Sequence, residues 1–340
     1  MDAGCDLPAD SARVGVLLVN TGSPDAPTEA AVRAYLSEFL MDDMIRPLPK
    51  PLWRLVLNHA ILPRRAPISA SRYRSIWEDG SPLVNGCRRL AAAVEREAAA
   101  QLGAGRVAVR AGMMYGQPSL AASLSELRAQ GCECVLVVPL YPQTARSTTG
   151  AALQALRAAQ DEADWHPPLV TVEGYGDDGG WQRAIADTVR AAGFDARRDC
   201  LLLSFHAVPL ADVRRGDTYP EQVDRSVAGI VRELGAPEGA WARAFQSRFE
   251  DGRKWTGPFA TAAVEKVARD GTRNLVVCCP GFSIDCLETR YDVEQVLRAA
   301  FFRNRPGAPD DAFAYVPCLG ASAAHARALL NVMAPALGLR

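Results

Sequence analysis

The sequence lacks the features that define several broad classes of protein. Its 38 Lys and Arg residues nearly balance its 39 Asp and Glu residues, and a formal net charge of −1 gives no reason to expect a nucleic-acid partner. No apolar run reaches the roughly 18 residues that would span a bilayer. Acids stand at Asp2, Asp6 and Asp10, where a secretory signal would need a basic stretch and then an apolar one. We therefore expect a cytoplasmic protein that is soluble or at most peripheral to a membrane.

The cysteines do not form the pattern of a disulfide framework or a metal cluster. There are nine of them, an odd number, and their spacing is irregular, so we expect reduced thiols. The spacing in the C-terminal part fits neither zinc nor iron–sulfur ligation. We expect core packing, and no iron–sulfur cluster, for Cys278, Cys279, Cys286 and Cys318.

The motifs that cradle phosphate groups are also missing. The loop "TGSP" (21–24) follows an apolar run but lacks the Gly-x-Gly-x-x-Gly spacing, and no Gly-Lys-Ser or Gly-Lys-Thr triplet occurs in the chain. The sequence therefore offers no phosphate-binding motif that would indicate a nucleotide-dependent enzyme.

The sequence contains apolar strand-like runs that alternate with helical patterns. Its composition is that of an ordinary globular protein, with 49% hydrophobic and 23% charged residues. Strands that alternate with helices predict an α/β fold with a parallel, doubly wound sheet. The expected strand-and-loop segments are 14–24, 107–116, 134–150, 200–209, 242–249 and 274–289, and the expected helices are 31–40, 82–103, 120–131, 220–234 and 258–270.

The chain reads as two similar halves. "VLVVPLYPQTARSTT" (135–149) and "LVVCCPGFSIDCLET" (275–289) both show an apolar strand, a turn with proline and a loop of small polar residues. We predict an N-terminal half at 14–170 and a C-terminal half at 171–330, flanked by tails at 1–13 and 331–340. Ligands of such sheets bind outside the carboxyl ends of the strands, so these loops are expected to face one cleft.

Three side chains of the C-terminal half are candidates for chemistry. His206 ends the apolar run "LLLSFH", and an imidazole with a pKa of about 6.5 exchanges protons near neutral pH. Glu288 and Asp292 are four residues apart on an expected helix and so share a face. Together the three could hold a divalent ion weakly or accept protons. The alternatives are a structural histidine and a solvated helix face.

The segment 41–67 mixes proline, large apolar residues and five basic residues. This mixture is typical of a segment at an interface, where basic side chains attract anionic groups. A solvated loop rim is the alternative. Its basic residues are Arg46, Lys50, Arg54, Arg64 and Arg65.

Several blocks of the chain, in order, resemble the bacterial type of ferrochelatase from about residue 14 to 330. They are "GVLLVNTGSPDAPT", "YRSIWEDGSPL", "YGQPS", "PLYPQTARSTT", "SFHAVP", "GDTYPEQ", "FQSRF", "CPGFSIDCLET" and "YVPCL". The resemblance implies two α/β halves with a porphyrin cleft between them. It also implies a lyase of haem biosynthesis that inserts ferrous iron into protoporphyrin IX, giving protohaem and two protons.

The resemblance assigns roles to individual residues. His206 matches the family's essential histidine, which binds metal or abstracts a proton. Glu288 matches the acid that faces it across the macrocycle, and Asp292 matches an acidic line that passes protons or metal. The segment 41–67 matches the lip through which porphyrin enters from the membrane surface. The positions that match the porphyrin pocket are Asn20, Thr21, Tyr73, Ser81, Met114, Tyr115, Gln246, Ser247 and Trp255.

The chain departs from the family pattern at several positions, which keeps rival functions open. The family's "MRYG" is "MMYG", with Met114 in place of arginine, and Thr144 replaces an aromatic residue of "PQYS". A paralogue that binds or carries porphyrin or haem without inserting metal is one alternative. A chelatase for cobalt or another tetrapyrrole is a second one.

The resemblance also implies the partners. Protoporphyrin IX and ferrous iron are expected as substrates, with no tightly bound cofactor. We further expect a monomer or a weak homodimer, and peripheral contact with the inner face of the membrane through 41–67.

Overall fold

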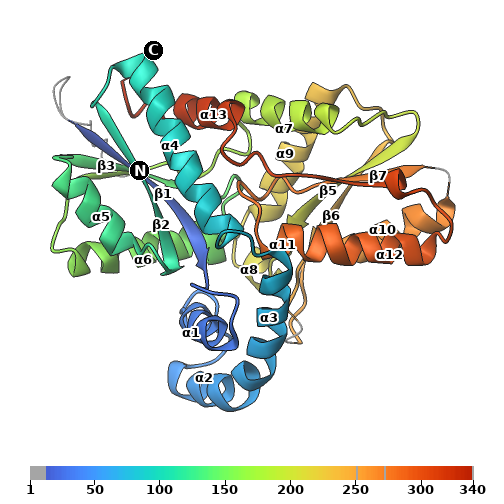
Figure 1. Cartoon of the computed structure of the whole chain (residues 1–340), viewed down its shortest axis with the longest axis horizontal. Helices are drawn as coiled ribbons and strands as arrows, with labels where there is room; N and C mark the ends of the chain where they lie inside the picture. Colours follow the sequence, from blue (N-terminus) through green and yellow to red (C-terminus); the bar gives the residue numbers. More distant parts are fainter. Residues whose placement is uncertain (1–12, 250–251, 272, 339–340) are drawn as a thin grey trace. The chain divides into compact units, whose positions relative to one another are not determined.

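The structure is a computed structural model of the chain that describes residues 13–249, 252–271 and 273–338. These residues form two compact units, each built on one parallel sheet (Figure 1). The first unit holds the described residues up to Leu140, Arg146–Glu173 and those from Ala321 onward. The second holds Tyr141–Ala145 and Gly174–Gly320. The predicted N-terminal tail lies outside the described residues except for Arg13, as does the end of the predicted C-terminal tail.

This division departs from the predicted boundaries at the loop Tyr141–Ala145, at residues 171–173, which lie in the first unit, and at residues 321–330. The loop Tyr141–Ala145 follows a strand of the first unit but belongs to the second, where Gln143 Nε2 donates to Ser226 Oγ at 2.9 Å. Residues 321–330, predicted in the C-terminal half, belong to the first unit, and from Ala323 they form helix α13 (Ala323–Met333), which packs against α4 (Pro82–Leu102).

The sheet of the first unit is built from strands that are apolar on both faces. Nearly every residue of β1 (Val14–Ser23) is buried, as expected for a central strand with helices on both sides. The parallel strands lie in the order β2-β1-β3-β4, where β2 is Val107–Gly116, β3 is Cys134–Pro139 and β4 is Leu169–Thr171. The remaining helices around the sheet are α5 (Leu120–Ala129), the π-helical turn η2 (Arg146–Gly150) and α6 (Ala151–Glu162).

The predicted interfacial segment is mostly helical. After α1 (Glu29–Leu40) and a turn come α2 (Lys50–Val56), the π-helical turn η1 (Leu57–Ile61) and α3 (Leu62–Ile76). The buried Trp53 anchors α2, because its Nε1 donates to the backbone oxygen of Leu40 at 2.6 Å. Other apolar side chains of the segment remain exposed, among them Leu52 at 51% and Leu55 at 60%.

The sheet of the second unit repeats the strand order of the first. Its parallel strands β5 (Asp199–His206), β6 (Trp241–Gln246), β7 (Asn274–Cys278) and β8 (Phe313–Val316) lie in the order β6-β5-β7-β8. The prediction of two similar parallel α/β halves is therefore confirmed. The helices of this unit are α7 (Gly179–Ala191), α8 (Leu210–Arg214), α9 (Tyr219–Leu234), α10 (Ala260–Asp270), α11 (Leu287–Arg290), the π-helical turn η3 (Asp292–Leu297), α12 (Arg298–Asn304) and the short η4 (Asp310–Ala312).

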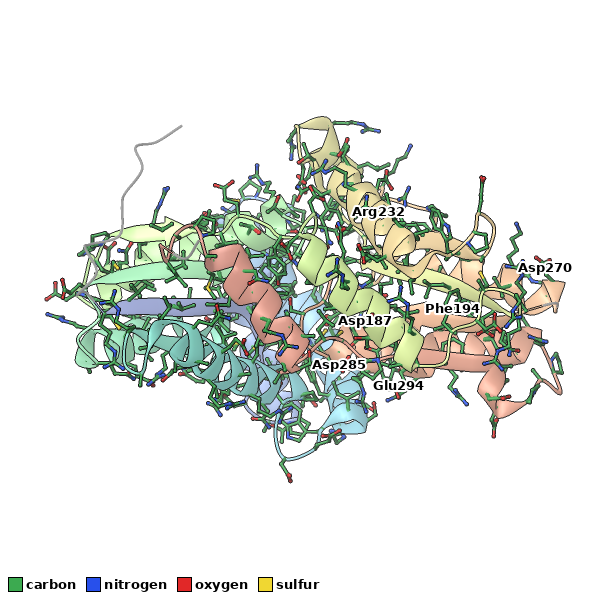
Figure 2. The ribbon with its side chains drawn as sticks, turned by 90° about the horizontal axis from the view of Figure 1, so that it is seen from above. Asp187, Phe194, Arg232, Asp270, Asp285 and Glu294 are labelled. Atoms are coloured by element: carbon green, nitrogen blue, oxygen red, sulfur yellow. The ribbon has the colours of Figure 1, made fainter. Side chains whose placement is uncertain are left out.

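One core cluster of the second unit lies between its sheet and the helices α10 and α12. Leu202 and Val277 from the sheet pack with Val264 of α10 and Phe301 of α12, all nearly inaccessible. Charged side chains of both signs extend from the helices, as Figure 2 shows for Asp187 and Arg232. Among the described residues, no helix combines the length and the apolarity needed to cross a bilayer.

Close packing in the second unit makes one glycine sensitive to substitution. We expect Gly176→Ala to lower the free energy of unfolding by about 1–3 kcal/mol, the usual cost of overpacking. A Cβ at Gly176 would lie 2.5 Å from Ser226 Oγ and 3.1 Å from the backbone oxygen of Pro142. Gly179→Ala is the control, because nothing lies within 4 Å of its Cβ position. Equal thermal midpoints of the two variants would contradict this packing.

Candidate active site

The carboxyl ends of three neighbouring strands meet at one edge of the second sheet. β5 ends at His206 and β6 at Gln246, and these two residues are paired in the parallel register. β7, on the other side of β5, ends at Cys278 and leads through a loop to α11, which carries Glu288. We call residues 287–297, which carry Glu288 and Asp292, the acid-bearing segment. The alignment of parallel strands therefore brings His206 and this segment to one edge of the sheet.

The His206 imidazole is partly exposed and held in one orientation. Its Nδ1 lies 2.6 Å from the backbone oxygen of Ala207. A carbonyl oxygen can only accept, so Nδ1 carries the proton in this hydrogen bond. The neutral ring then presents the lone pair of Nε2 to a proton or a metal ion.

Two aromatic rings flank His206, and the sequence alone did not single them out. The ring centres of Phe249 and Phe282 lie 6.4 Å and 6.5 Å from that of His206. Phe249 also packs edge-on against Trp255 at 5.4 Å. The sequence signal that could have identified them is their position in the blocks "FQSRF" and "CPGFSIDCLET", close to the predicted site residues.

Hydrogen bonds to Asp285 fix the start of the helix that carries Glu288. Asp285 Oδ1 accepts from Thr289 Oγ1 at 3.1 Å, from the hydroxyl of Tyr315 and from the backbone N–H of Cys318 at 3.4 Å. Glu288 lies in the first turn of α11 and is partly exposed.

The prediction of one continuous α-helix through Glu288 and Asp292 is wrong, because the chain changes from α-helix to π-helix between them. α11 ends at Arg290, and the chain from Asp292 is π-helical, with the N–H of Val296 donating to the oxygen of Tyr291 at 2.9 Å. The four-residue spacing therefore does not place the two acids on one α-helical face. π-helical turns occur often at functional sites.

The two acids are instead connected through the residues at the end of β6. Gln246 Nε2 donates to the backbone oxygen of Glu288 at 2.7 Å. Ser247 Oγ donates to Asp292 Oδ2 at 2.6 Å. Gln246 and Trp255, both predicted to border the porphyrin, are only 6% and 8% exposed.

Buried thiols lie next to the acid-bearing segment. Burial raises the pKa of Cys278 to about 12 and raises the pKa of Cys279 and Cys286 well above the usual range. No described cysteine takes part in a disulfide bond. In residues 13–249, 252–271 and 273–338, no three His, Cys, Asp or Glu side chains form a group that could hold a metal ion.

The predicted site residues of the first unit have local structural partners. Ser81 caps α4, accepting from the N–H of Val84 at 3.4 Å, and the Tyr115 hydroxyl donates to Asp42 at 2.8 Å. Asn20 Oδ1 accepts from the N–H of Thr21 at 2.8 Å, where β1 approaches its carboxyl end. Tyr73 and Met114 are 8% and 9% exposed.

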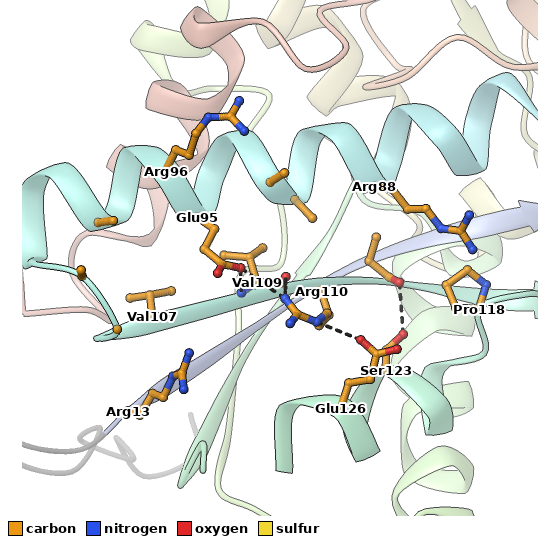
Figure 3. A pocket seen from close by; sticks show the side chains of 16 residues that line it. Arg13, Arg88, Glu95, Arg96, Val107, Val109, Arg110, Pro118, Ser123 and Glu126 are labelled. Carbon is orange, nitrogen blue, oxygen red and sulfur yellow. Dashed lines mark hydrogen bonds and ion pairs between the residues drawn. The ribbon is translucent and has the colours of Figure 1, made fainter. Parts of the chain in front are cut away.

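A groove of about 590 Å³ in the first unit contains none of the predicted site residues (Figure 3). It follows the free edge of β2, whose backbone groups are occupied by side chains. Glu95 accepts from the N–H of Val109 at 2.9 Å, and Arg110 donates to the oxygen of Val109 and to Glu126. Such side chains protect an edge strand from pairing with another chain.

The structure of SirB from Bacillus subtilis with Fe3+ has a similar fold. The TM-score is 0.54, at 12% sequence identity, and the match covers 95% of each chain. The two chains therefore share the same fold class, an α/β fold of two parallel sheets flanked by helices.

Sequence comparison identifies the family. Residues 13–337 match the family described as Ferrochelatase. A ferrochelatase of Nitrosococcus oceani is 39% identical over 326 residues, which cover 95% of this chain and 86% of that protein. One of Azoarcus sp. is 41% identical over 313 residues, covering 91% and 84%. The chain belongs to the ferrochelatase family, whose members are lyases that insert ferrous iron into porphyrin.

Proposed function

We propose that this chain inserts ferrous iron into protoporphyrin IX, giving protohaem and two protons in the last step of haem biosynthesis. Membership of the ferrochelatase family supports the reaction. The structural observation that carries the proposal is the meeting of His206 and the Glu288 segment at one edge of the second sheet. Iron is a substrate in this proposal, and no tightly bound cofactor takes part.

The chemistry of metal insertion defines what the site must supply. Two pyrrole protons must leave the macrocycle, and the ion must lose bound water. We assign His206 as the group that accepts a proton or binds the metal through Nε2, which the contact of Nδ1 with Ala207 leaves available. Glu288 acts from the opposite face of the macrocycle, and Asp292 passes protons or metal along the same segment.

Aromatic side chains near His206 suit a flat conjugated ligand. Trp255, Phe249 and Phe282 offer rings that pack against a macrocycle. Bending the ring out of plane costs about 1–5 kcal/mol, which binding of the rest of the ring supplies. By their match to the family, we also assign porphyrin contacts to Asn20, Thr21, Tyr73, Ser81, Met114 and Tyr115 of the first unit, whereas Gln246 and Ser247 of the second unit border the porphyrin.

Two substitutions test the site directly. We expect His206→Ala and Glu288→Gln each to lower the rate of iron insertion by about a hundredfold or more, the usual contribution of a proton-transfer group. Porphyrin affinity changes much less, because the macrocycle keeps its aromatic contacts. Anaerobic absorbance, following loss of free porphyrin and appearance of haem, measures the rate.

Residues of the same type outside the strand ends serve as controls. His166→Ala removes an exposed imidazole of the first unit that lies 3.6 Å from Asp161, and Glu265→Gln removes a half-buried carboxylate of α10 that pairs with Arg269. Both controls are expected to keep the wild-type rate. Full turnover by His206→Ala would remove it from the mechanism. Tight porphyrin binding by the wild-type protein without any metallation would instead indicate a carrier.

We further propose that α2 and α3 rest on a membrane surface on the cytoplasmic side. Large apolar side chains are exposed there, with Leu55 at 60%, Ile68 at 54% and Leu52 at 51%. Exposed basic residues accompany them, which suits an anionic lipid surface. They are Lys50, Arg54, Arg64 and Arg65.

The vesicle affinity of this surface is measurable. We expect the double variant Leu52→Ser, Leu55→Ser to bind vesicles containing anionic lipid at least about tenfold more weakly, because two leucines lose their burial in lipid. Co-sedimentation gives the affinity. Val296→Ser is the control, because Val296 is 46% exposed but lies outside α2 and α3. Equal binding by the double variant and the wild type would contradict the membrane contact.

A further inference from the structure

The Gln246 side chain uses all of its hydrogen-bonding capacity within the protein. A glutamine amide has two N–H donors and an oxygen that accepts two hydrogen bonds. Nε2 donates to the Glu288 backbone oxygen at 2.7 Å and to Ser247 Oγ at 3.5 Å. Oε1 accepts from Ser204 Oγ and from Cys279 Sγ. At 6% exposure the amide has no polar group left for a substrate.

The next residue, Ser247, is held in an unusual backbone conformation. Its φ is +58°, in the left-handed region that residues other than glycine seldom adopt. Such strain persists where the surrounding contacts require it, and it is common at functional sites. Here the conformation accompanies a 2.6 Å hydrogen bond from Ser247 Oγ to Asp292 Oδ2.

Gln246 and Ser247 together hold two points of the acid-bearing segment. Gln246 holds the backbone of Glu288 in α11, and Ser247 holds the carboxylate of Asp292 at the start of η3. The winding changes between these points, so helical periodicity does not fix one acid relative to the other. Gln246 is also the register partner of His206. One dipeptide therefore links the histidine strand to both acids.

We propose that Gln246 and Ser247 are positioning residues that set the directions of Glu288 and Asp292 relative to His206. This inference rests on the proposed roles of those acids in metal insertion. Gln246 then affects the reaction by positioning Glu288 and not by contacting porphyrin itself. Ser247 affects it by positioning Asp292.

Ser247→Gly separates positioning from folding. Glycine adopts a φ of +58° without strain, so the thermal midpoint is expected to stay the same or rise. The hydroxyl is lost, so kcat for iron insertion should fall about ten- to hundredfold, the factor that a hydrogen bond to a charged group carries. The KM for ferrous iron should rise, while the Kd for porphyrin, measured by fluorescence quenching, should not change. Unchanged kcat and KM in this variant would overturn the proposal.

Gln246→Met tests the second link with a side chain of similar shape. We expect at least about a tenfold loss of kcat, with the porphyrin Kd again unchanged. The matched control is Gln182→Met, because Gln182 is 4% exposed and its Nε2 donates to the backbone oxygen of Gly176 at 3.1 Å. The control should lose stability but keep its kcat. A weaker porphyrin Kd in Gln246→Met with an unchanged kcat would overturn the positioning role.

Glu288→Gln distinguishes failure of this inference from failure of the proposed function. If Glu288→Gln lowers kcat but Ser247→Gly and Gln246→Met do not, the acids act without this support and the inference fails. If Glu288→Gln keeps the wild-type kcat, the proposed role of the acid fails, and the positioning of Glu288 has no catalytic consequence.

Discussion

The pairing of β5 with β6 in parallel register is the constraint on which the candidate site depends. It places His206 beside Gln246, and the amide of Gln246 reaches the backbone of Glu288. The buried apolar residues of these strands hold this register, because a slip by one residue would turn each side chain to the other face. The β5–β6 pairing and the hydrogen bond of the Gln246 amide thus together set the position of the acid-bearing segment relative to the His206 imidazole.

The environment of this segment favours carboxylates as its charged groups. Burial raises the pKa of Cys279, near Asp292, and of Cys286, beside Glu288, so both thiols stay protonated and uncharged at neutral pH. Asp285 is tied to Thr289 and Tyr315 and anchors the helix start. Glu288 is partly exposed and lies where the winding of the chain changes. The acids thus combine access to solvent with fixed anchoring, which suits groups that exchange protons or metal with a substrate.

Much of the fold could be predicted from the sequence, because apolar runs such as "VGVLLVN" and "CLLLSFH" identify buried parallel strands directly. The C-terminal boundary of the second half could not be predicted in this way, because α13 packs within the first unit through tertiary contacts that no local pattern encodes. The same holds at the site. His206 at a strand end and Glu288 in a first turn follow from local signals. The π-helical winding after Tyr291 and the positive φ of Ser247 depend on hydrogen bonds between segments far apart in the sequence. Family resemblance supplied the porphyrin-binding positions, which remain predictions.

A crystal structure with a bound, non-metallated porphyrin would test the central claim most directly. The account predicts the macrocycle between His206 Nε2 and the Glu288 carboxylate, with one group at each face and Gln246 still bonded to the Glu288 backbone. A macrocycle bound elsewhere, or one with both side chains beyond hydrogen-bond reach of the pyrrole nitrogens, would contradict it.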